Sequence, residues 1–315
     1  MRFIVYGAGG LGGSFGARLA AAGDDVGFLA RGGHLAAIRS QGLAVYEGGG
    51  ETHLYRLQAS DDPAALAPAD IVLLCVKMYD LVAVLPRLPA LLCPDGAVLT
   101  VQNGIEAPQL VAEAVGRPRV IAGAVYLNAG LERPGVIRVR GAMRGKPAIE
   151  FGELHAGRSA RVEALAERLN RAGIDAAPAA DTDAMLWQKF CLVSATSAAT
   201  ALARRPIGEL REDAESRWLI EQAVAETAAL ARARGVRLDA DAEARVLALI
   251  DSMPTDGKAS QLLDLEAGKP LELDWLSGAI RRLGREAGVA TPLHRAAYAA
   301  LKPWRHGPPA HPPEG

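Results

Sequence analysis

The residues whose spacing points most directly to chemistry form one glycine-rich stretch, Gly7-Ala8-Gly9-Gly10-Leu11-Gly12. It follows an apolar run at residues 3–6 and precedes a helical pattern at residues 11–22. In a strand–loop–helix unit, the first glycine permits a tight turn, the second lets the backbone approach a pyrophosphate, and the third lets helix and strand pack closely. The stretch therefore predicts a dinucleotide-binding loop; the alternative is a flexible run in a chain with 34 glycines.

The residue that follows the second expected strand, at residues 26–30, is Arg31. A site that prefers NAD carries an acidic residue here for the ribose 2′-hydroxyl, whereas an arginine can bind a 2′-phosphate. The sequence therefore favours NADPH over NADH. A solvated loop cation is the alternative interpretation of Arg31.

Lys77 and Asn103 each follow an expected buried strand, at residues 71–76 and 97–101. Ligands of open parallel sheets bind beyond the carboxyl ends of the strands. Both side chains are therefore candidates for the ligand site. A surface lysine and an ordinary Asn-Gly turn are the alternatives.

Lys189 lies among large apolar residues on an expected helix at residues 183–203. At 100° per residue it shares a stripe with Val193, Thr196 and Thr200. A lysine held in a cleft can donate a proton to a developing alkoxide, provided that desolvation lowers its pKa toward neutrality. The alternative is a lysine that extends from a buried helix face into water.

Four further polar residues in the segment 258–274 bear on the site. Ser260 shares one face of an expected helix at residues 258–267 with Asp264, four positions later. Helix capping is the ordinary role for an acid just before the next expected helix, and we expect it of Asp274. Glu272 is less well explained by capping, so it remains a candidate for chemistry.

The elements that must position these residues fall into two groups. The first half alternates short β-branched runs with alanine-rich helical runs, which is typical of a parallel sheet covered on both faces. Beyond about residue 180 only helical patterns follow. For 315 residues we therefore expect an α/β doubly wound domain at 1–180, a mostly helical domain at 181–305 and a flexible tail at 306–315.

Two details of the first domain are less regular. Residues 44–45 and 54–57 are expected to form a small pair of strands. Residues 120–127 and 136–139, on either side of a Pro-Gly turn, are expected as antiparallel strands at the edge of the main sheet, where residues 149–151 join them.

Composition excludes several classes of protein. Thirty-five basic against 36 acidic residues give a net charge of −1, which is not expected of a nucleic-acid or anionic-membrane binder. Three widely spaced cysteines in apolar surroundings fit reduced thiols, and we expect no metal site. With no secretory pattern and no apolar run approaching ~20 residues, we expect a cytoplasmic protein. The sequence does not decide between a monomer and a homodimer.

In order and spacing, these blocks resemble the ketopantoate reductase (2-dehydropantoate 2-reductase) family. The resemblance runs nearly end to end, through GAGGLG, LARGGHL, LLCVKMYD, VQNGIE, LWQKF and the serine–aspartate–glutamate pattern of residues 260–272. It implies a Rossmann-type domain followed by a helical domain, with the active site in the cleft between them. It also implies an NADPH-dependent enzyme of pantothenate biosynthesis, whose substrate is a small 2-oxo acid.

The resemblance implies a role for each candidate residue by its position. The glycine loop would bind the cofactor and Arg31 its 2′-phosphate. Lys77 and Asn103 would line the nicotinamide and substrate end. Lys189 would be the catalytic lysine, and Ser260 would hold the substrate carboxylate. Glu272 would bind the substrate hydroxyl and contact the cofactor side of the site.

One departure concerns the helix that carries the lysine. The family usually has asparagine four residues after the lysine, and often another four later, where this chain has Val193 and Ser197. A hydrogen bond to a charged group contributes roughly 1.5–3 kcal/mol, so losing the first asparagine should cost about one to two powers of ten in affinity. Either ketopantoate is held differently, or the substrate is another branched 2-oxo acid that packs on Val193. A non-catalytic NADPH-binding sensor is a third alternative, although the lysine, serine and glutamate argue against it.

Overall fold

A computed structural model describes residues 1–54 and 56–308. The chain divides into two compact units. The first contains Met1–Gln102 and Glu106–Met185, and the second contains Asn103–Ile105 and the chain from Leu186 onward. Of the expected tail, residues 309–315 lie outside the described residues, while Gly307 forms an isolated β-bridge with Arg305.

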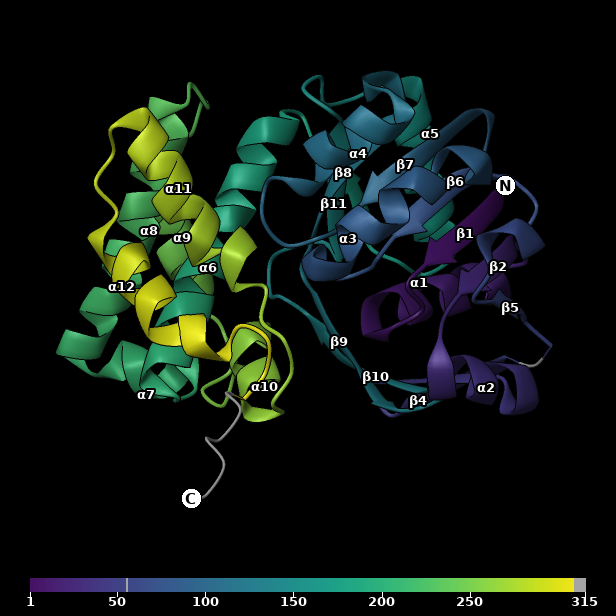
Figure 1. Cartoon of the computed structure of the whole chain (residues 1–315), viewed down its shortest axis with the longest axis horizontal. Helices are drawn as coiled ribbons and strands as arrows, with labels where there is room; N and C mark the ends of the chain where they lie inside the picture. The colour runs from purple at the N-terminus through teal and green to yellow at the C-terminus, as the bar shows by residue number, and fades with distance from the viewer. Residues whose placement is uncertain (55, 309–315) are drawn as a thin grey trace, which may run out of the picture. The chain divides into compact units, whose positions relative to one another are not determined.

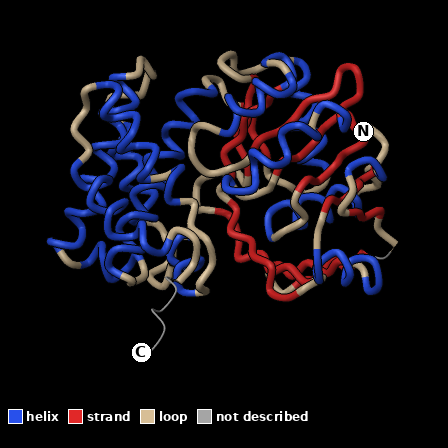
Figure 2. Tube along the Cα trace, in the orientation of Figure 1, coloured by secondary structure: helices blue, strands red, loops and turns tan. Residues whose placement is uncertain are grey.

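The first unit is built on an eight-stranded sheet in the order β12-β11-β8-β7-β6-β1-β2-β5. Figure 2 shows these strands in red, with helices on both faces. The pairs from β8 through to β5 are parallel, and β11 is antiparallel to β8. The strands are β1 (Arg2–Tyr6), β2 (Asp25–Leu29), β5 (Gln58–Ser60), β6 (Ala69–Leu74), β7 (Leu92–Thr100), β8 (Val120–Val125), β11 (Ile149–Glu153) and β12 (Ala176–Pro178). Central strands such as β1 read as continuous apolar runs because both faces are covered.

A second sheet has the order β4-β3-β10-β9 and packs on the first helix of the chain. Its strands are β3 (Leu43–Glu47), β4 (Gly50–Leu54), β9 (Leu127–Arg133) and β10 (Val136–Ala142). Figure 1 shows β9 and β10 running away from the main sheet toward β4. The helices of this unit are α1 (Gly10–Ala21), α2 (Gly32–Gln41), α3 (Met78–Val84), α4 (Ala107–Val115) and α5 (Ala160–Arg171).

The second sheet corrects two expectations. The antiparallel partner of β10 is β9, not the strand at residues 120–127, because β8 stays in the main sheet while Ile137 of β10 is buried against α1. The partner of β3 is β4, which shares only Leu54 with the expected strand at residues 54–57; residue 55 lies outside the described residues. Gly48 and Gly49 both have positive φ, so they form a two-residue hairpin turn that starts the pairing at Gly50.

The second unit is helical, as expected. It contains most of α6 (Thr182–Ala203), followed by α7 (Ile207–Glu212), α8 (Ala214–Ala233), α9 (Ala242–Asp251), α10 (Ser260–Glu266), α11 (Ser277–Ala287) and α12 (Pro292–Leu301). Residues 190–201 of α6 are all buried, so this helix is the core of the unit. The expected fold class, a doubly wound sheet followed by a mostly helical region, is confirmed. No helix in the described part of the chain could span a membrane.

A buried histidine links three helices of this unit. His294 of α12 lies with Nε2 3.1 Å from the Ala223 carbonyl oxygen and Nδ1 3.1 Å from Ser277 Oγ. The carboxylate of Glu226 accepts the backbone N–H of His294 at 3.1 Å. Burial lowers the pKa of His294 to about 4 and raises the pKa of Glu226.

The depressed pKa of His294 predicts a loss of stability in mild acid. Between pH 6.5 and about 4 the unfolded chain binds a proton at His294 that the folded chain does not, so the free energy of unfolding falls as pH falls. The full effect is on the order of 3 kcal/mol. Urea unfolding of the wild type and His294→Gln across this range should show a weaker pH dependence in the variant. An equal pH dependence of the unfolding free energy in the two proteins would contradict this prediction, because Glu226 titrates in both.

Candidate active site

The glycine loop joins β1 to α1 and is shaped by close contacts. Gly7 has φ +100°, and a Cβ added there would lie 2.9 Å from the backbone of Cys75 and Val76. A Cβ on Gly12 would lie 2.3 Å from the Gly7 carbonyl oxygen. Neither position can hold a side chain without moving backbone, so both glycines are required by the turn and by the close packing of helix on strand.

The middle of the loop is open instead. A Cβ on Gly9 would meet no atom within 4 Å, and Gly9 caps α1 without a side-chain hydrogen bond. Gly10 and Leu11 begin the helix, and no acidic residue stands in its first turn. The first N–H groups of a helix lack intrahelical partners and carry partial positive charge, so this end of α1 suits a phosphate. The residues present therefore fit a dinucleotide cofactor.

His34 fixes the loop, and the sequence alone did not single it out. Its Nε2 lies 2.6 Å from the Ala8 carbonyl oxygen, and its Nδ1 accepts the N–H of Gly135 at 3.0 Å. Because Nδ1 accepts, the proton must be on Nε2, which donates to Ala8. The partner Gly135 lies in the turn between β9 and β10, so no local sequence signal could have revealed this role.

Two cations lie at the carboxyl edge of the main sheet. Arg31 follows β2, precedes α2 and has a side chain that is 79% exposed, in an ion pair with Asp80 of α3. Lys77 follows β6, caps α3 and is half-buried. Gln102, beyond the end of β7, donates to the carbonyl oxygen of Leu74 at 2.8 Å and so ties neighbouring strand ends together.

The loop that carries Asn103 belongs to the helical unit. A Cβ added to Gly104, which has φ +96°, would lie 3.0 Å from the carbonyl oxygen of Trp275. Ile105 packs against a buried apolar cluster that includes Trp187 and Phe190 of α6. These two aromatic residues flank Lys189, and Trp275 follows Glu272 by three positions. The loop therefore brings Asn103 beside the two segments that carry Lys189 and Glu272.

Two charged residues of the candidate site, Lys189 and Glu272, are shielded from solvent to different degrees. Lys189 is half-buried. The rings of Trp187 and Phe190, which lie on either side of it in the sequence, pack edge to face with 5.7 Å between their centroids. Glu272 is 6% exposed and stands between two buried leucines, Leu271 and Leu273. Carboxylates are rarely buried to this degree unless they are paired or hydrogen-bonded.

The expected capping role of Asp274 is wrong. Its Oδ1 accepts the hydroxyl of Tyr298 at 2.8 Å, while Leu276 caps α11. The reason is a short 3-10 helix, η5 (Leu273–Trp275), that separates Asp274 from the start of α11.

Ser260 begins α10 and is exposed. The next residue, Gln261, donates to the Ser197 carbonyl oxygen at 3.4 Å, which places the start of α10 beside α6. Ser197 is two turns beyond Lys189, or about 12 Å along the axis. The Oγ of Ser197 and Oε1 of Gln261 are buried without a hydrogen-bond partner among the described residues.

The residues at the departure from the family pattern are packed inside the helical unit. Val193 is 9% exposed and belongs to the apolar cluster around Trp187 and Phe190. The Thr196 hydroxyl donates to the Leu192 carbonyl oxygen at 2.9 Å, within its own helix. Thr196 therefore does not replace the missing asparagine as a donor.

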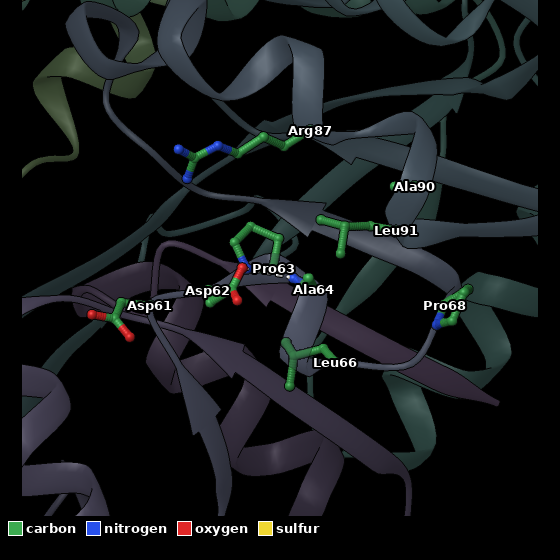
Figure 3. A pocket seen from close by; sticks show the side chains of 9 residues that line it. All are labelled: Asp61, Asp62, Pro63, Ala64, Leu66, Pro68, Arg87, Ala90 and Leu91. Carbon is green, nitrogen blue, oxygen red and sulfur yellow. Dashed lines mark hydrogen bonds between the residues drawn. The ribbon is translucent and has the colours of Figure 1, made fainter.

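A pocket of about 770 Å³ lies elsewhere in the first unit (Figure 3). It contains none of the expected site residues and is lined by Asp61, Asp62, Pro63, Ala64, Leu66, Pro68, Arg87, Ala90 and Leu91. Its two carboxylates have local partners: Asp62 accepts the Ala64 N–H at 3.0 Å, and Asp61 lies 3.9 Å from Arg39. We assign it no role.

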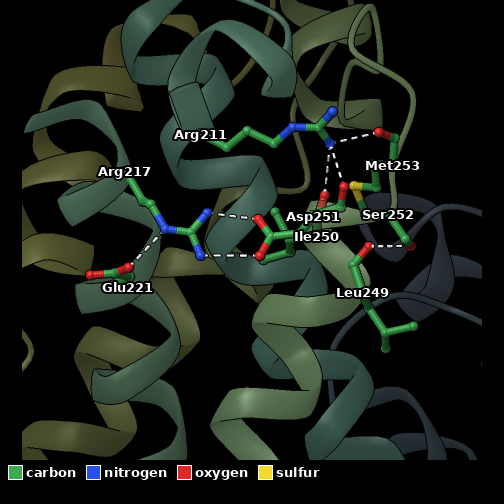
Figure 4. Close-up of polar contacts among 8 residues, drawn as sticks. All are labelled: Arg211, Arg217, Glu221, Leu249, Ile250, Asp251, Ser252 and Met253. Atoms are coloured by element: carbon green, nitrogen blue, oxygen red, sulfur yellow. Dashed lines mark hydrogen bonds and ion pairs between the residues drawn. The ribbon is translucent and has the colours of Figure 1, made fainter. Parts of the chain in front are cut away.

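A cluster of charged residues in the helical unit is structural (Figure 4). Arg211 donates to three carbonyl oxygens at the end of α9, those of Ile250, Asp251 and Met253. Arg217 makes two hydrogen bonds to the Asp251 carboxylate, at 2.6 and 3.1 Å, and lowers the pKa of that carboxyl. Arg211 thus satisfies carbonyl groups that the end of a helix leaves open, while Arg217 neutralises the Asp251 carboxylate beside them.

No group of three or more potential ligands in the described part of the chain could hold a metal ion. The three cysteines are free. Burial raises the pKa of the Cys191 thiol to about 12 and also raises that of Cys75, which lies against the glycine loop. Both thiols are therefore unreactive at neutral pH.

Comparisons with known proteins show the family of this chain. Residues 3–155 match the family "Ketopantoate reductase PanE/ApbA", and residues 181–305 match its C-terminal domain. The chain is 31% identical to a 2-dehydropantoate 2-reductase from Mesorhizobium japonicum, over 96% of this chain and 97% of the relative. A crystal structure of 2-dehydropantoate 2-reductase from Geobacter metallireducens is similar with a TM-score of 0.88 and 28% identity, over 96% of this chain and 99% of that one.

Proposed function

The chain belongs to the ketopantoate reductase family of NAD(P)-dependent oxidoreductases, and on that basis we propose that it reduces ketopantoate to pantoate with NADPH, a step of pantothenate biosynthesis. One observation carries the proposal. The helical unit gathers the segments of Asn103, Lys189 and Glu272, which are far apart in the sequence. These residue types suit a small anion that bears a carbonyl and a hydroxyl group.

The residues have distinct roles in this reaction. A nicotinamide cofactor held by the glycine loop would supply the hydride for the 2-oxo carbon. Lys189 donates a proton from Nζ to the carbonyl oxygen as negative charge develops there, and water later restores that proton. Glu272 accepts a hydrogen bond from the distal hydroxyl. Ser260 and Asn103 hold the carboxylate and carbonyl, and Lys77 lines the nicotinamide end; such positioning lowers the barrier by itself.

Another branched 2-oxo acid is the second candidate substrate, favoured by Val193. An apolar residue there suits an alkyl group better than a polar one. A panel of 2-oxo acids with NADPH, including ketopantoate, separates these functions. We expect ketopantoate to be reduced most efficiently. Oxidation of NADPH with other 2-oxo acids alone would favour the second candidate. Tight NADPH binding without any turnover would indicate a sensor and overturn both.

Arg31→Ala tests the proposed cofactor preference. Loss of a charge-assisted hydrogen bond to the 2′-phosphate should weaken NADPH binding about 10- to 100-fold and leave NADH binding almost unchanged. Titration of both nucleotides by fluorescence measures this. Arg39→Ala, which removes an exposed arginine of α2, the helix that Arg31 precedes, is the matched control and should change neither affinity. Equal losses of both nucleotides in Arg31→Ala would exclude Arg31 as the 2′-phosphate ligand.

A homodimer is one of the two states of assembly that the sequence leaves open. Light scattering of the purified chain would distinguish it from a monomer.

A further inference from the structure

An ion pair lies at the carboxyl edge of the main sheet, beside the glycine loop. Arg31 follows β2, and Asp80 lies in the first turn of α3, which follows β6. In the sheet, β1 lies between β2 and β6, and the glycine loop begins where β1 ends. The pair therefore spans the strand end from which the loop emerges.

The two side chains of the ion pair differ in how freely they can move. The Arg31 side chain is 79% exposed, whereas that of Asp80 is 29% exposed. The backbone of Asp80 is fixed by a hydrogen bond from its N–H to the Lys77 carbonyl oxygen at 2.9 Å. A carboxylate in the first turn of a helix is also favoured by the helix dipole. Asp80 is thus the fixed partner, and Arg31 is the one that can turn to a ligand.

This geometry affects the 2′ position of a bound adenosine. A 2′-phosphate that reaches Arg31 must share the guanidinium with Asp80 and is repelled by its negative charge. A ribose 2′-hydroxyl can instead donate to a carboxylate. Arg31 therefore offers a partner to the 2′-phosphate of NADPH, and Asp80 offers one to the 2′-hydroxyl of NADH.

We propose that Asp80 is a specificity-determining residue that reduces the preference for NADPH over NADH created by Arg31, so that the site accepts both cofactors. The proposal rests on the proposed function, because it requires the glycine loop and Arg31 to bind a nicotinamide dinucleotide.

Binding of adenosine 2′,5′-bisphosphate and of AMP to the full chain tests this without turnover. The two probes differ only in the 2′-phosphate. In Asp80→Asn the bisphosphate should bind about tenfold more tightly, because one like charge is removed. AMP binding should weaken or stay the same. Asp80→Ser is a second variant for the case in which Asp80→Asn does not fold.

A matched control lies at the opposite edge of the same strands. Asp25 at the start of β2 pairs with Arg2 at the start of β1 at 2.5 Å. Asp25→Asn removes the same charge there and should change neither affinity.

The outcomes separate this inference from the proposed function. If the bisphosphate binds the wild type but the Asp80 variants leave the ratio of the two affinities unchanged, the inference is overturned and the cofactor site stands. If neither probe nor NADPH binds the wild type, the cofactor site fails and the inference fails with it.

Discussion

Lys189→Ala should lower kcat by about two to three powers of ten, because one preorganised donor to a developing oxyanion typically contributes ~3–4 kcal/mol. NADPH binding should stay nearly unchanged, since the cofactor's phosphates are assigned to the glycine loop and Arg31 in the other unit. Steady-state kinetics with ketopantoate and a separate fluorescence titration of NADPH measure the two quantities.

The control for this prediction is Lys269→Ala, which removes an exposed lysine from the same unit. It should leave kcat and NADPH binding unchanged. Lys189→Arg adds a second comparison, because arginine keeps the positive charge but does not give up a proton near neutral pH. We expect its kcat to stay low. A Lys189→Ala enzyme that kept most of its turnover would remove the lysine from the mechanism.

Glu272→Gln should raise the KM for ketopantoate about three- to tenfold, because a hydrogen bond to a charged group contributes roughly 1.5–3 kcal/mol and the neutral amide oxygen of glutamine keeps about half of it. The KM for 2-oxoisovalerate, which has no distal hydroxyl, should change far less. Glutamine preserves the size of a side chain that is 6% exposed, so the fold should be retained, and thermal melting checks this.

The control is Glu266→Gln, which removes an exposed carboxylate of α10 that pairs with Lys258. It should leave both KM values unchanged. Equal increases for both substrates in Glu272→Gln would show that Glu272 does not recognise the hydroxyl. Its role would then lie in positioning Lys189.

Local features could be predicted from the sequence. The turn at Gly7 and the packing at Gly12 depend on residues close by and on the strand just behind the loop. Lys189 and Glu272 are also distinct in the sequence, because each is a charged residue among apolar neighbours. The catalytic and binding roles assigned to them remain predictions.

Features that depend on distant parts of the chain could not be predicted. The role of His34 depends on Gly135, about a hundred positions later. The ion pair of Arg31 depends on Asp80, 49 positions later. The pairing of β10 with β3 depends on the packing of both strands against α1. The helical pattern does not reveal the short 3-10 helix that separates Asp274 from the start of α11, so the absence of a capping role for Asp274 could not be predicted.

In the proposed function the chain binds both the 2-oxo acid group and the distal hydroxyl of ketopantoate. The most direct test compares kcat/KM for ketopantoate and 2-oxoisovalerate with NADPH as the reductant. We expect a value at least about tenfold higher for ketopantoate, the effect of one hydrogen bond to Glu272. Equal values, or a preference for 2-oxoisovalerate, would contradict it and identify Val193 as part of a site for an alkyl 2-oxo acid.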